Sequence, residues 1–414
     1  VSVIGMLCGL RVLTEMMSPT EFGRVALALA VAALAHQAFV QPLAMASERF
    51  LSIALERKEL LAYLKGIQKI FYWIAFFLIG ASLFLSVMLP HPWSVLLPLA
   101  LLMTLAIAAN DVANYIQNAA RHRAVVALHQ AAFEWLKWGV ACVAMLLLGA
   151  TGASAILGYI AAMLAILVSQ AFFFSRTVRS LKGDEELPES AVVSEWLRYI
   201  WAYGWPFITW GTITSCHMAS DRWGLSWFRE TTEVGKYSVL FQLGYYPVLF
   251  LSGIVLQVVA PLIYAHAGDG QDVARLAKVH RWLTVIVGAM LLFVFAIVLF
   301  LARFHELVFS FAVAEEFREA SWLLPLFALA GGLSIAGQTA AMFQTARGLS
   351  KRLIAPKVIT ATLGIVCNLI GAHVAGILGV VISHSAISLI YLVWMFLEAN
   401  QFTRECGNGF ITQR

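Results

Sequence analysis

The chain alternates between long apolar runs and short polar segments along its whole length. A bilayer core about 30 Å thick is spanned by roughly 20 apolar residues in a helix, and runs of this length recur as far as residue 397. Short segments with strictly alternating polarity, which are typical of membrane β-barrels, do not occur. The pattern predicts an all-α polytopic membrane protein with about 12 transmembrane helices. The expected spans are 1–16, 25–47, 70–90, 93–117, 132–150, 154–175, 199–220, 237–262, 282–302, 320–345, 355–371 and 375–397.

Three apolar stretches are too long for a single span, and each contains a break. The sequence "PHP" divides the first stretch at Pro90–Pro92, "GATGAS" divides the second at residues 149–154, and "GAHVAG" divides the third at residues 371–376. Because glycine and proline favour turns, we expect a tight helical hairpin at each position.

Composition agrees with a membrane protein and changes the meaning of the charge. Hydrophobic residues make up 61% of the chain, against about 45–50% in soluble domains. The net charge of +5 would suggest nucleic acid as a partner of a soluble protein, whereas basic residues of membrane proteins gather on the cytoplasmic side. Placing the N-terminus in the cytoplasm puts twenty Lys and Arg residues inside and six outside. Both termini are therefore expected in the cytoplasm, and no nucleic acid is expected.

The first segment, Val1–Met17, is expected to form a short first span and not a cleavable signal peptide, because it holds Arg11 and Glu15. The chain starts with Val, so a few residues are expected to precede it. The segment Ser47–Lys69 is basic and amphipathic. It is expected to lie along the cytoplasmic headgroups and to contact anionic lipids.

A short motif repeats at the start of each half of the chain. The segment "LTEMMSPTEFGRVALAL" (Leu13–Leu29) aligns without gaps with "LSWFRETTEVGKYSVLF" (Leu225–Phe241), 212 residues later. Thr20, Glu21 and Gly23 thereby fall on Thr232, Glu233 and Gly235. This indicates two pseudo-symmetric six-helix lobes, 1–175 and 199–414, joined by a cytoplasmic linker at 176–198. Repeated halves of this kind are typical of alternating-access transporters.

The residues around the motif resemble a known family. "SPTEFGRVALALAVAALAHQAFVQPLAMASERF", "SDRWGLSWFRETTEVGKYSVLFQLGYYP" and "FQTARGLSKRL" resemble bacterial polysaccharide flippases, the O-antigen or Wzx-like branch of the multidrug/oligosaccharidyl-lipid/polysaccharide exporter superfamily. The resemblance covers nearly the whole chain. It implies a flippase of the bacterial inner membrane that moves a polyprenyl-diphosphate-linked oligosaccharide from the cytoplasmic to the periplasmic leaflet. It also implies polysaccharide polymerase and chain-length proteins as partners.

Charged residues in the spans are the first candidates for substrate contact, because they are costly in a membrane. Arg11 suits a diphosphate through paired hydrogen bonds, or it forms an ion pair with Glu15 one helical turn away. Asp221 and Arg222 are expected to end the seventh span, next to an outer loop over 219–236. There Arg222 either faces the anionic headgroup with Asp221 as its counter-ion, or the two fix the depth of the span.

Polar residues within apolar runs form a second set of candidates. Asp111 and Asn114 share a face of the fourth span and suit either a proton or sodium coupling site or an interhelical hydrogen-bond cluster. Further candidates for contacts with sugar hydroxyls are Gln37, Gln41, Gln242 and Tyr245.

Motifs for enzyme chemistry and for cofactors are absent. The five cysteines are widely spaced, without metal or disulfide spacing. No phosphate-binding glycine loop or nucleophile elbow occurs. We therefore expect a transporter without catalysis, metal or cofactor, driven by a proton or sodium gradient or by the substrate gradient.

Three other functions compete with the flippase hypothesis. A drug exporter of the same superfamily would share the fold but favour acidic cavity residues. A major-facilitator transporter also contains an Asp-Arg-x-Gly loop, yet on the cytoplasmic side, whereas the charge bias places "DRWG" outside. A membrane glycan polymerase would need large periplasmic loops, and the longest outer loops expected here, 219–236 and 303–319, are short.

Overall fold

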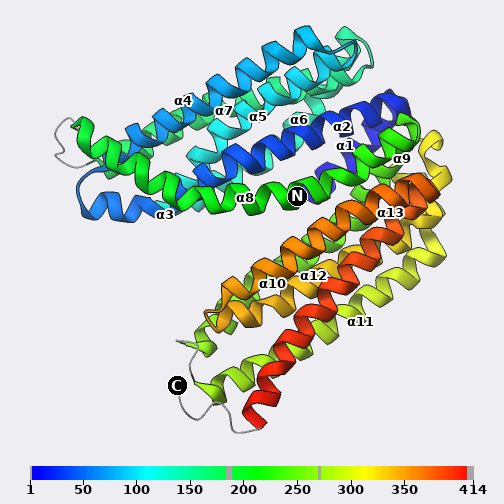
Figure 1. The fold of residues 1–414 in the computed structure, drawn as a ribbon. Coiled ribbons are helices and arrows are strands. Elements are labelled where there is room, and N and C mark those ends of the chain that lie inside the picture. Colours follow the sequence, from blue (N-terminus) through cyan, green and yellow to red (C-terminus); the bar gives the residue numbers. More distant parts are fainter. Residues whose placement is uncertain (1, 183–188, 269–271, 408–414) are drawn as a thin grey trace. The chain divides into compact units, whose positions relative to one another are not determined.

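The computed structural model describes residues 2–182, 189–268 and 272–407. These residues are almost entirely helical, and none of them lies in a strand (Figure 1). In chain order the elements are α1 (Ser2–Met16), α2 (Pro19–Ala35), η1 (His36–Val40), α3 (Gln41–Glu56), α4 (Leu60–Met88), α5 (Trp93–Ala119), α6 (Arg123–Leu148), α7 (Gly152–Leu181), α8 (Ser190–Phe228), α9 (Thr231–Leu240), η2 (Phe241–Tyr245), α10 (Tyr246–Ala267), α11 (Val273–Ala312), η3 (Glu315–Leu323), α12 (Leu324–Ala346), η4 (Ser350–Leu353) and α13 (Ile354–Gly407).

The helices form two compact units, Val1–Ala219 and Ser220–Arg414. The boundary therefore lies inside α8. Of the linker expected at 176–198, residues 183–188 lie outside the described residues, and the flanking parts belong to α7 and α8. The lobe boundaries inferred from the sequence stay a prediction.

In the first unit, α5 lies at the centre of the packing. It contacts α2, α3, α4, α6 and α7, while α1 packs on α6. Helices α1 and α6 pack closely at Gly9, where any side chain would collide with the ring of Trp138. One apolar cluster of this unit joins α3, α4 and the start of α8 around the buried Tyr63 and Trp196. Helices on several sides of α5 leave its polar residues surrounded by protein.

In the second unit, α12 takes the central place. It contacts α10, α11 and α13, and its small residues allow these helices to approach closely. A side chain at Gly332 would meet Val294 of α11, and one at Gly337 would meet Tyr391 of α13. Such small-residue contacts are typical of helix packing in membranes.

The predicted breaks are confirmed. Helix α4 ends at Met88 and α5 begins at Trp93, while α6 ends at Leu148 and α7 begins at Gly152. Helix α13 is continuous by hydrogen bonding but has non-helical backbone angles at Ala375 and Gly376, where it turns back on itself. With α2–η1–α3 and α9–η2–α10 as one pass each and α13 as two, the described residues form the 12 passes that were predicted.

By length and hydropathy alone, eight stretches of the described residues qualify as membrane spans. Four passes make up the difference from 12. Helix α1 has 15 residues and is below the length criterion, the two passes of α13 fall in one stretch, and α8 and α9–η2–α10 are not among the eight stretches. The length and hydropathy of these stretches are those of a membrane protein.

The prediction of a long outer loop after the seventh span is wrong. Helix α8 continues through Asp221 and Arg222 to Phe228, and α9 begins at Thr231. The repeated "TEFG" and "TEVG" motifs accordingly form the first turns of α2 and α9. The expected loop over 303–319 is likewise shorter, because α11 extends to Ala312. Helix persists through the charged residues because they find partners within the fold.

Candidate functional site

Each unit contains a π-helical turn that ends next to a proline. The segments are "HQAFV" before Gln41-Pro42 and "FQLGY" before Tyr246-Pro247. Proline lacks an N–H and its ring clashes with the carbonyl four residues earlier, so a wider turn accommodates it within a continuous helix. Gln37 and Gln242 occupy the same place in the two turns. Such insertions are frequent at functional sites.

The first polar cluster lies in the first unit and joins α2–η1–α3, α5 and α7. Its members are His36, Gln41, Asp111, Asn114, Tyr115, Gln117 and Gln170. His36 Nε2 lies 2.7 Å from Asp111 Oδ2. Gln41 donates a hydrogen bond to the Tyr115 hydroxyl (2.9 Å). The cluster thus places the predicted Asp111 and Asn114 together with Gln41, one of the predicted sugar contacts.

An amide network extends this cluster toward the end of α5. The Gln170 amide donates to Asn114 Oδ1 (3.0 Å) and to Gln117 Oε1 (2.9 Å). These three side chains are almost fully buried. Gln117 Nε2, Gln170 Oε1 and Asn110 Oδ1 are buried without a hydrogen-bond partner in the described protein. Buried polar atoms of this kind are commonly satisfied by water.

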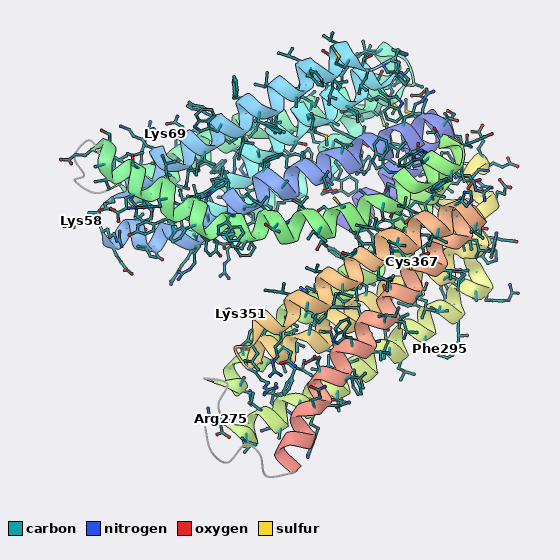
Figure 2. All side chains as sticks on the ribbon, viewed as in Figure 1. Lys58, Lys69, Arg275, Phe295, Lys351 and Cys367 are labelled. Atoms are coloured by element: carbon teal, nitrogen blue, oxygen red, sulfur yellow. The ribbon has the colours of Figure 1, made fainter. Side chains whose placement is uncertain are left out.

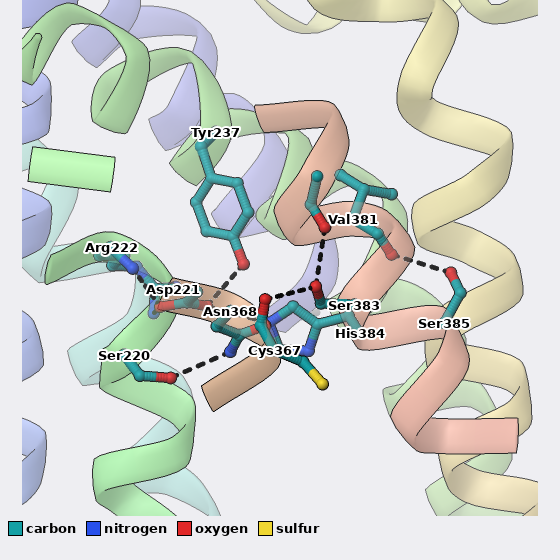
Figure 3. A network of polar contacts seen from close by, with 11 residues as sticks. Ser220, Asp221, Arg222, Tyr237, Cys367, Asn368, Val381, Ser383, His384 and Ser385 are labelled. Atoms are coloured by element: carbon teal, nitrogen blue, oxygen red, sulfur yellow. Dashed lines mark hydrogen bonds and ion pairs between the residues drawn. The ribbon is translucent and has the colours of Figure 1, made fainter. Parts of the chain in front are cut away.

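The second polar cluster lies in the second unit and consists of Ser220, Asp221, Arg222, Tyr237, Asn368 and His384 (Figure 3). Tyr237 of α9 donates its hydroxyl to Asp221 Oδ2 (2.5 Å), and His384 Nε2 of α13 lies 3.3 Å from the same oxygen. Asp221 Oδ1 accepts from the Arg222 backbone N–H (2.5 Å).

Burial explains why this carboxylate needs so many partners. The Asp221 side chain is 0% exposed and that of His384 is 2% exposed. A buried charge is costly unless it is paired and hydrogen-bonded. The Arg222 guanidinium supplies the compensating charge 3.4 Å from Asp221 Oδ1 and lies over the ring of Phe241, 4.7 Å from its centroid. Arg222 thus has the predicted counter-ion, but within a helix and not at a span end.

Four further predicted residues are not members of the two clusters, although the Tyr245 ring packs beside the second one, 6.1 Å from the ring of His384. Arg11 forms an ion pair with Glu15 on α1, with side chains 35% and 51% exposed. Gln37 packs against Gly211 of α8. Tyr245 is buried and stacks on Phe241, with ring centroids 4.7 Å apart. Gln242 is half-buried in η2. These contacts do not test whether the four residues bind substrate, so their roles in substrate binding stay predictions.

Glu21 and Glu233, which align between the two halves of the chain, have a structural role that the alignment of the halves did not reveal. Glu21 accepts a hydrogen bond from the Gly152 N–H (2.8 Å) at the hairpin between α6 and α7. Glu233 lies at the hairpin within α13, where a side chain at Gly376 would come within 2.7 Å of its carboxylate. Each motif therefore places a carboxylate at the last hairpin of its own unit.

Sequence reasoning missed His384, Tyr237 and Asn368 as partners of the Asp221 region, and Gln117 and Gln170 in the first cluster. All five are polar residues within or next to apolar runs. That signal marks residues buried in protein, but it does not pair them. The recurrent spacing from Gln37 to Pro42 and from Gln242 to Pro247 was the available signal for the two π-helical turns.

The sequence was then compared with known families. A model of a family described as "Polysaccharide biosynthesis protein" matches residues 5–265. The chain belongs to this polysaccharide biosynthesis protein family. No curated protein sequence matches the chain.

Solved structures show which fold this family member has. An inward-facing multidrug resistance MATE family transporter of the MOP superfamily superimposes with a TM-score of 0.68 at 13% identity, over 98% of this chain and 96% of that one. The lipid II flippase MurJ, in an inward closed conformation, gives a TM-score of 0.70 at 14% identity, over 96% and 86%. The polysaccharide biosynthesis protein therefore has the fold of the MOP-superfamily transporters.

The polar side chains of the two clusters interact through ion pairs and hydrogen bonds. Across residues 2–182, 189–268 and 272–407, no group of three or more His, Cys, Asp or Glu side chains is placed to hold a metal ion. Lys58 and Lys69 lie toward one end of the first unit, and Arg275 and Lys351 lie toward one end of the second (Figure 2). This agrees with the charge asymmetry along the sequence.

Proposed function

We propose that this protein is a flippase that moves a polyprenyl-diphosphate-linked oligosaccharide from the cytoplasmic to the periplasmic leaflet of the bacterial inner membrane. It would act by alternating access in the synthesis of a surface polysaccharide such as O-antigen or lipopolysaccharide. The observation that carries the proposal is the match to the polysaccharide biosynthesis family over residues 5–265. The fold shared with a lipid II flippase supports it.

The chemistry of the cargo supports a role for basic side chains in this proposal. A diphosphate and its sugars do not cross hydrocarbon unaided, so the protein must offer polar and cationic contacts along the path. Arg222 is preorganised by Asp221 and by the ring of Phe241. Arg11 is partly exposed on α1. Guanidinium groups suit phosphate oxygens through bidentate hydrogen bonds, and we assign both arginines to the diphosphate.

A multidrug exporter is the second candidate, because the fold of a MATE transporter is matched nearly as well as that of the flippase. The fold therefore does not separate the two, and the family match favours the glycan cargo. A glycan polymerase is disfavoured among the described residues by short connections, such as the one between Phe228 and Thr231. Polymerase and chain-length proteins are instead proposed as partners.

Gene deletion and complementation test the proposed function. Deletion should abolish surface polysaccharide and leave lipid-linked repeat units in the inner leaflet, and the wild-type gene should restore both. An Arg222→Ala gene should restore transport less well by a factor of about ten to a hundred, since a hydrogen bond to a charged group contributes roughly 1.5–3 kcal/mol. An Arg303→Ala gene is the control, because Arg303 is an exposed arginine of α11.

Membrane abundance of each variant must be measured in parallel, and Arg222→Lys should give an intermediate result because it keeps the charge without the bidentate geometry. If the deletion strain keeps its surface polysaccharide and becomes more sensitive to drugs, the protein is an exporter and the flippase hypothesis is wrong.

A further inference from the structure

We propose that the second unit binds one membrane phospholipid, with two acyl chains and a phosphoethanolamine headgroup, on the surface of α11 and α13. The two helices lie side by side and contact each other (Figure 1). This lipid site is separate from the proposed function and does not depend on the cargo. Two adjoining apolar cavities, and charged residues at one end of them, define it.

The first cavity lies between α11 and α13 and has a volume of about 370 Å³, within the roughly 300–1,000 Å³ of known ligand pockets. It is lined mainly by apolar side chains, among them Leu291 on α11 and Leu392 and Phe396 on α13. Gly288 also lines it, and a side chain at this position would meet nothing within 4 Å. The absence of a side chain at Gly288 therefore enlarges the cavity, whose surface suits a hydrocarbon chain.

A second cavity, of about 550 Å³, lies on the neighbouring face of α13. It shares Val393 and Leu397 with the first cavity, so these two side chains form a ridge between the cavities. Both are apolar, and they are 48% and 56% exposed. Contiguous exposed apolar surface of this kind is typical of interaction sites. Two hydrocarbon chains, one on each side of the ridge, would cover it, which is the arrangement of a lipid with two acyl chains.

Both cavities lie just inside one surface of the membrane. The uncharged part of α11 begins after Arg281, and that of the second α13 arm ends before Glu398. His280 and Asn400 form a hydrogen bond that joins the two helices next to these charges. Charged side chains near the ends of membrane-spanning helices reach the headgroups. Arg281 and Glu398 therefore lie at the level of the headgroups, with the cavities on the hydrocarbon side of them.

The length of the first cavity fits one leaflet. From Thr284 to Leu291, its limits on α11, the helix rises by about 10 Å, at roughly 1.5 Å per residue. Half of a hydrocarbon core about 30 Å thick is about 15 Å. A chain in this cavity therefore belongs to a lipid of the leaflet whose headgroups lie at Arg281. The charge bias places that leaflet on the cytoplasmic side.

The two charges at this end suit a headgroup that carries both a phosphate and an ammonium group. Arg281 is exposed and lies one turn before Thr284, while Glu398 lines the second cavity. Neither side chain forms an ion pair with another of the described residues. A guanidinium group binds phosphate oxygens through paired hydrogen bonds, and a carboxylate accepts hydrogen bonds from an ammonium group. A headgroup with negative charge alone would face Glu398 without an ammonium group to balance it.

The proposed cargo fits these cavities less well. Its single polyprenyl chain would fill one of the two cavities, and its diphosphate has no ammonium group for Glu398. It also has to leave the cytoplasmic leaflet, whereas the first cavity ends at Leu291 within that leaflet. The occupant is therefore a phospholipid that stays in the cytoplasmic leaflet.

Native mass spectrometry of the full chain in mild detergent tests the site. The protein is offered equal amounts of phosphatidylethanolamine, phosphatidylglycerol and a polyprenyl phosphate. Wild-type protein should retain phosphatidylethanolamine about tenfold more often than either of the others. Gly288→Phe fills the first cavity and should lower this retention by about tenfold or more. Gly80→Phe on α4 is the matched control, because a side chain there also meets nothing within 4 Å, and it should behave as the wild type does.

Substitution of the charged residues tests the headgroup separately from the chains. Glu398→Gln should remove the preference for phosphatidylethanolamine over phosphatidylglycerol. Arg281→Gln should lower the retention of both phospholipids by about tenfold, because each has a phosphate. Arg303→Gln, at the other end of α11, is the control and should change neither.

Thermal unfolding gives a second readout of the same site. Added phosphatidylethanolamine should raise the unfolding temperature of the wild type and of Gly80→Phe, but not that of Gly288→Phe, because only a protein that binds the lipid is stabilised by it. Equal retention by the wild type, Gly288→Phe and Arg281→Gln would mean unspecific lipid cover and would overturn the site. Preferred retention of phosphatidylglycerol would overturn the headgroup, and preferred retention of the polyprenyl phosphate would assign the cavities to the cargo instead. If Gly288→Phe does not fold, the two charge substitutions still decide between these outcomes.

Discussion

Asp221 is the residue at which three helices of the second unit meet. It lies on α8, receives the Tyr237 hydroxyl from α9 and faces His384 of α13. Ser220 next to it accepts a hydrogen bond from Asn368 in the other arm of the α13 hairpin (3.0 Å). A fully buried carboxylate has no water to replace a lost donor. Its partners therefore determine how firmly these helices are held together.

Tyr237→Phe removes one donor from this carboxylate and keeps the ring that packs on Phe327. The free energy of unfolding should fall by about 1.5–3 kcal/mol, the value of a hydrogen bond to a charged group. Thermal unfolding in detergent measures the loss. Tyr246→Phe, which changes a half-exposed tyrosine nine residues further along the chain, should be close to neutral. Equal effects of the two substitutions would contradict the role given to Asp221.

The α13 hairpin depends on glycine at the level of the element. Gly376 has a φ of 56°, in the left-handed region that glycine adopts readily. Gly371 and Gly379 bring the two arms into backbone contact, and the Ser383 hydroxyl donates to the Cys367 carbonyl across the hairpin (2.8 Å). The turn has room for the carboxylate of Glu233 only because residue 376 has no side chain.

Gly376→Ala should therefore destabilise the protein. A left-handed conformation costs a residue with a side chain about 1–2 kcal/mol, and the Glu233 carboxylate must also move. Gly288→Ala is the control, because a side chain there meets nothing within 4 Å. Alanine in mid-helix is favoured over glycine by up to about 1 kcal/mol, so the control should be neutral or stabilising. Thermal unfolding of both variants gives the comparison, and a neutral Gly376→Ala would refute the strain.

The elements could be predicted from the sequence wherever apolar length decides them. The runs and their Gly and Pro breaks predicted every helical pass, including the turn at residues 371–376. The loop over 219–236 was wrong because charges were assumed to end a span. Asp221 and Arg222 stay helical since Tyr237, Phe241 and His384 satisfy them, and these partners come from segments up to 163 residues away.

The candidate site was predictable only in part, for the same reason. Asp111 and Asn114 were identified because they share a helix face, which the helical period fixes. Their partners His36 and Gln170 come from other helices, and no local pattern pairs them. The π-helical turn at His36–Val40 adds one residue to a turn of the helix and so changes the directions of His36 and Gln37. The regular helical period does not predict this change.

At the scale of the whole molecule, the fold and the family point to a membrane transporter, and the charge bias predicts its orientation. A reporter enzyme that works only in the cytoplasm should be active when it is fused after Arg414. A reporter that works only in the periplasm should be active when it is inserted at Gly149, in the α6–α7 turn. In this orientation, twenty of the 28 Lys and Arg residues lie inside. The reverse pattern of reporter activity would contradict the predicted orientation.

The most direct test of the central claim is lipid flipping by the purified protein. Proteoliposomes would contain a fluorescent polyprenyl-diphosphate oligosaccharide, and a membrane-impermeant glycan-cleaving enzyme outside would report how much reaches the outer leaflet. The account predicts that wild-type protein exposes the inner pool with time, and that Arg222→Ala does so more slowly by a factor of about ten to a hundred at equal protein content. An inner pool that stays protected from the enzyme, in vesicles where the same protein transports a cationic drug, would contradict it.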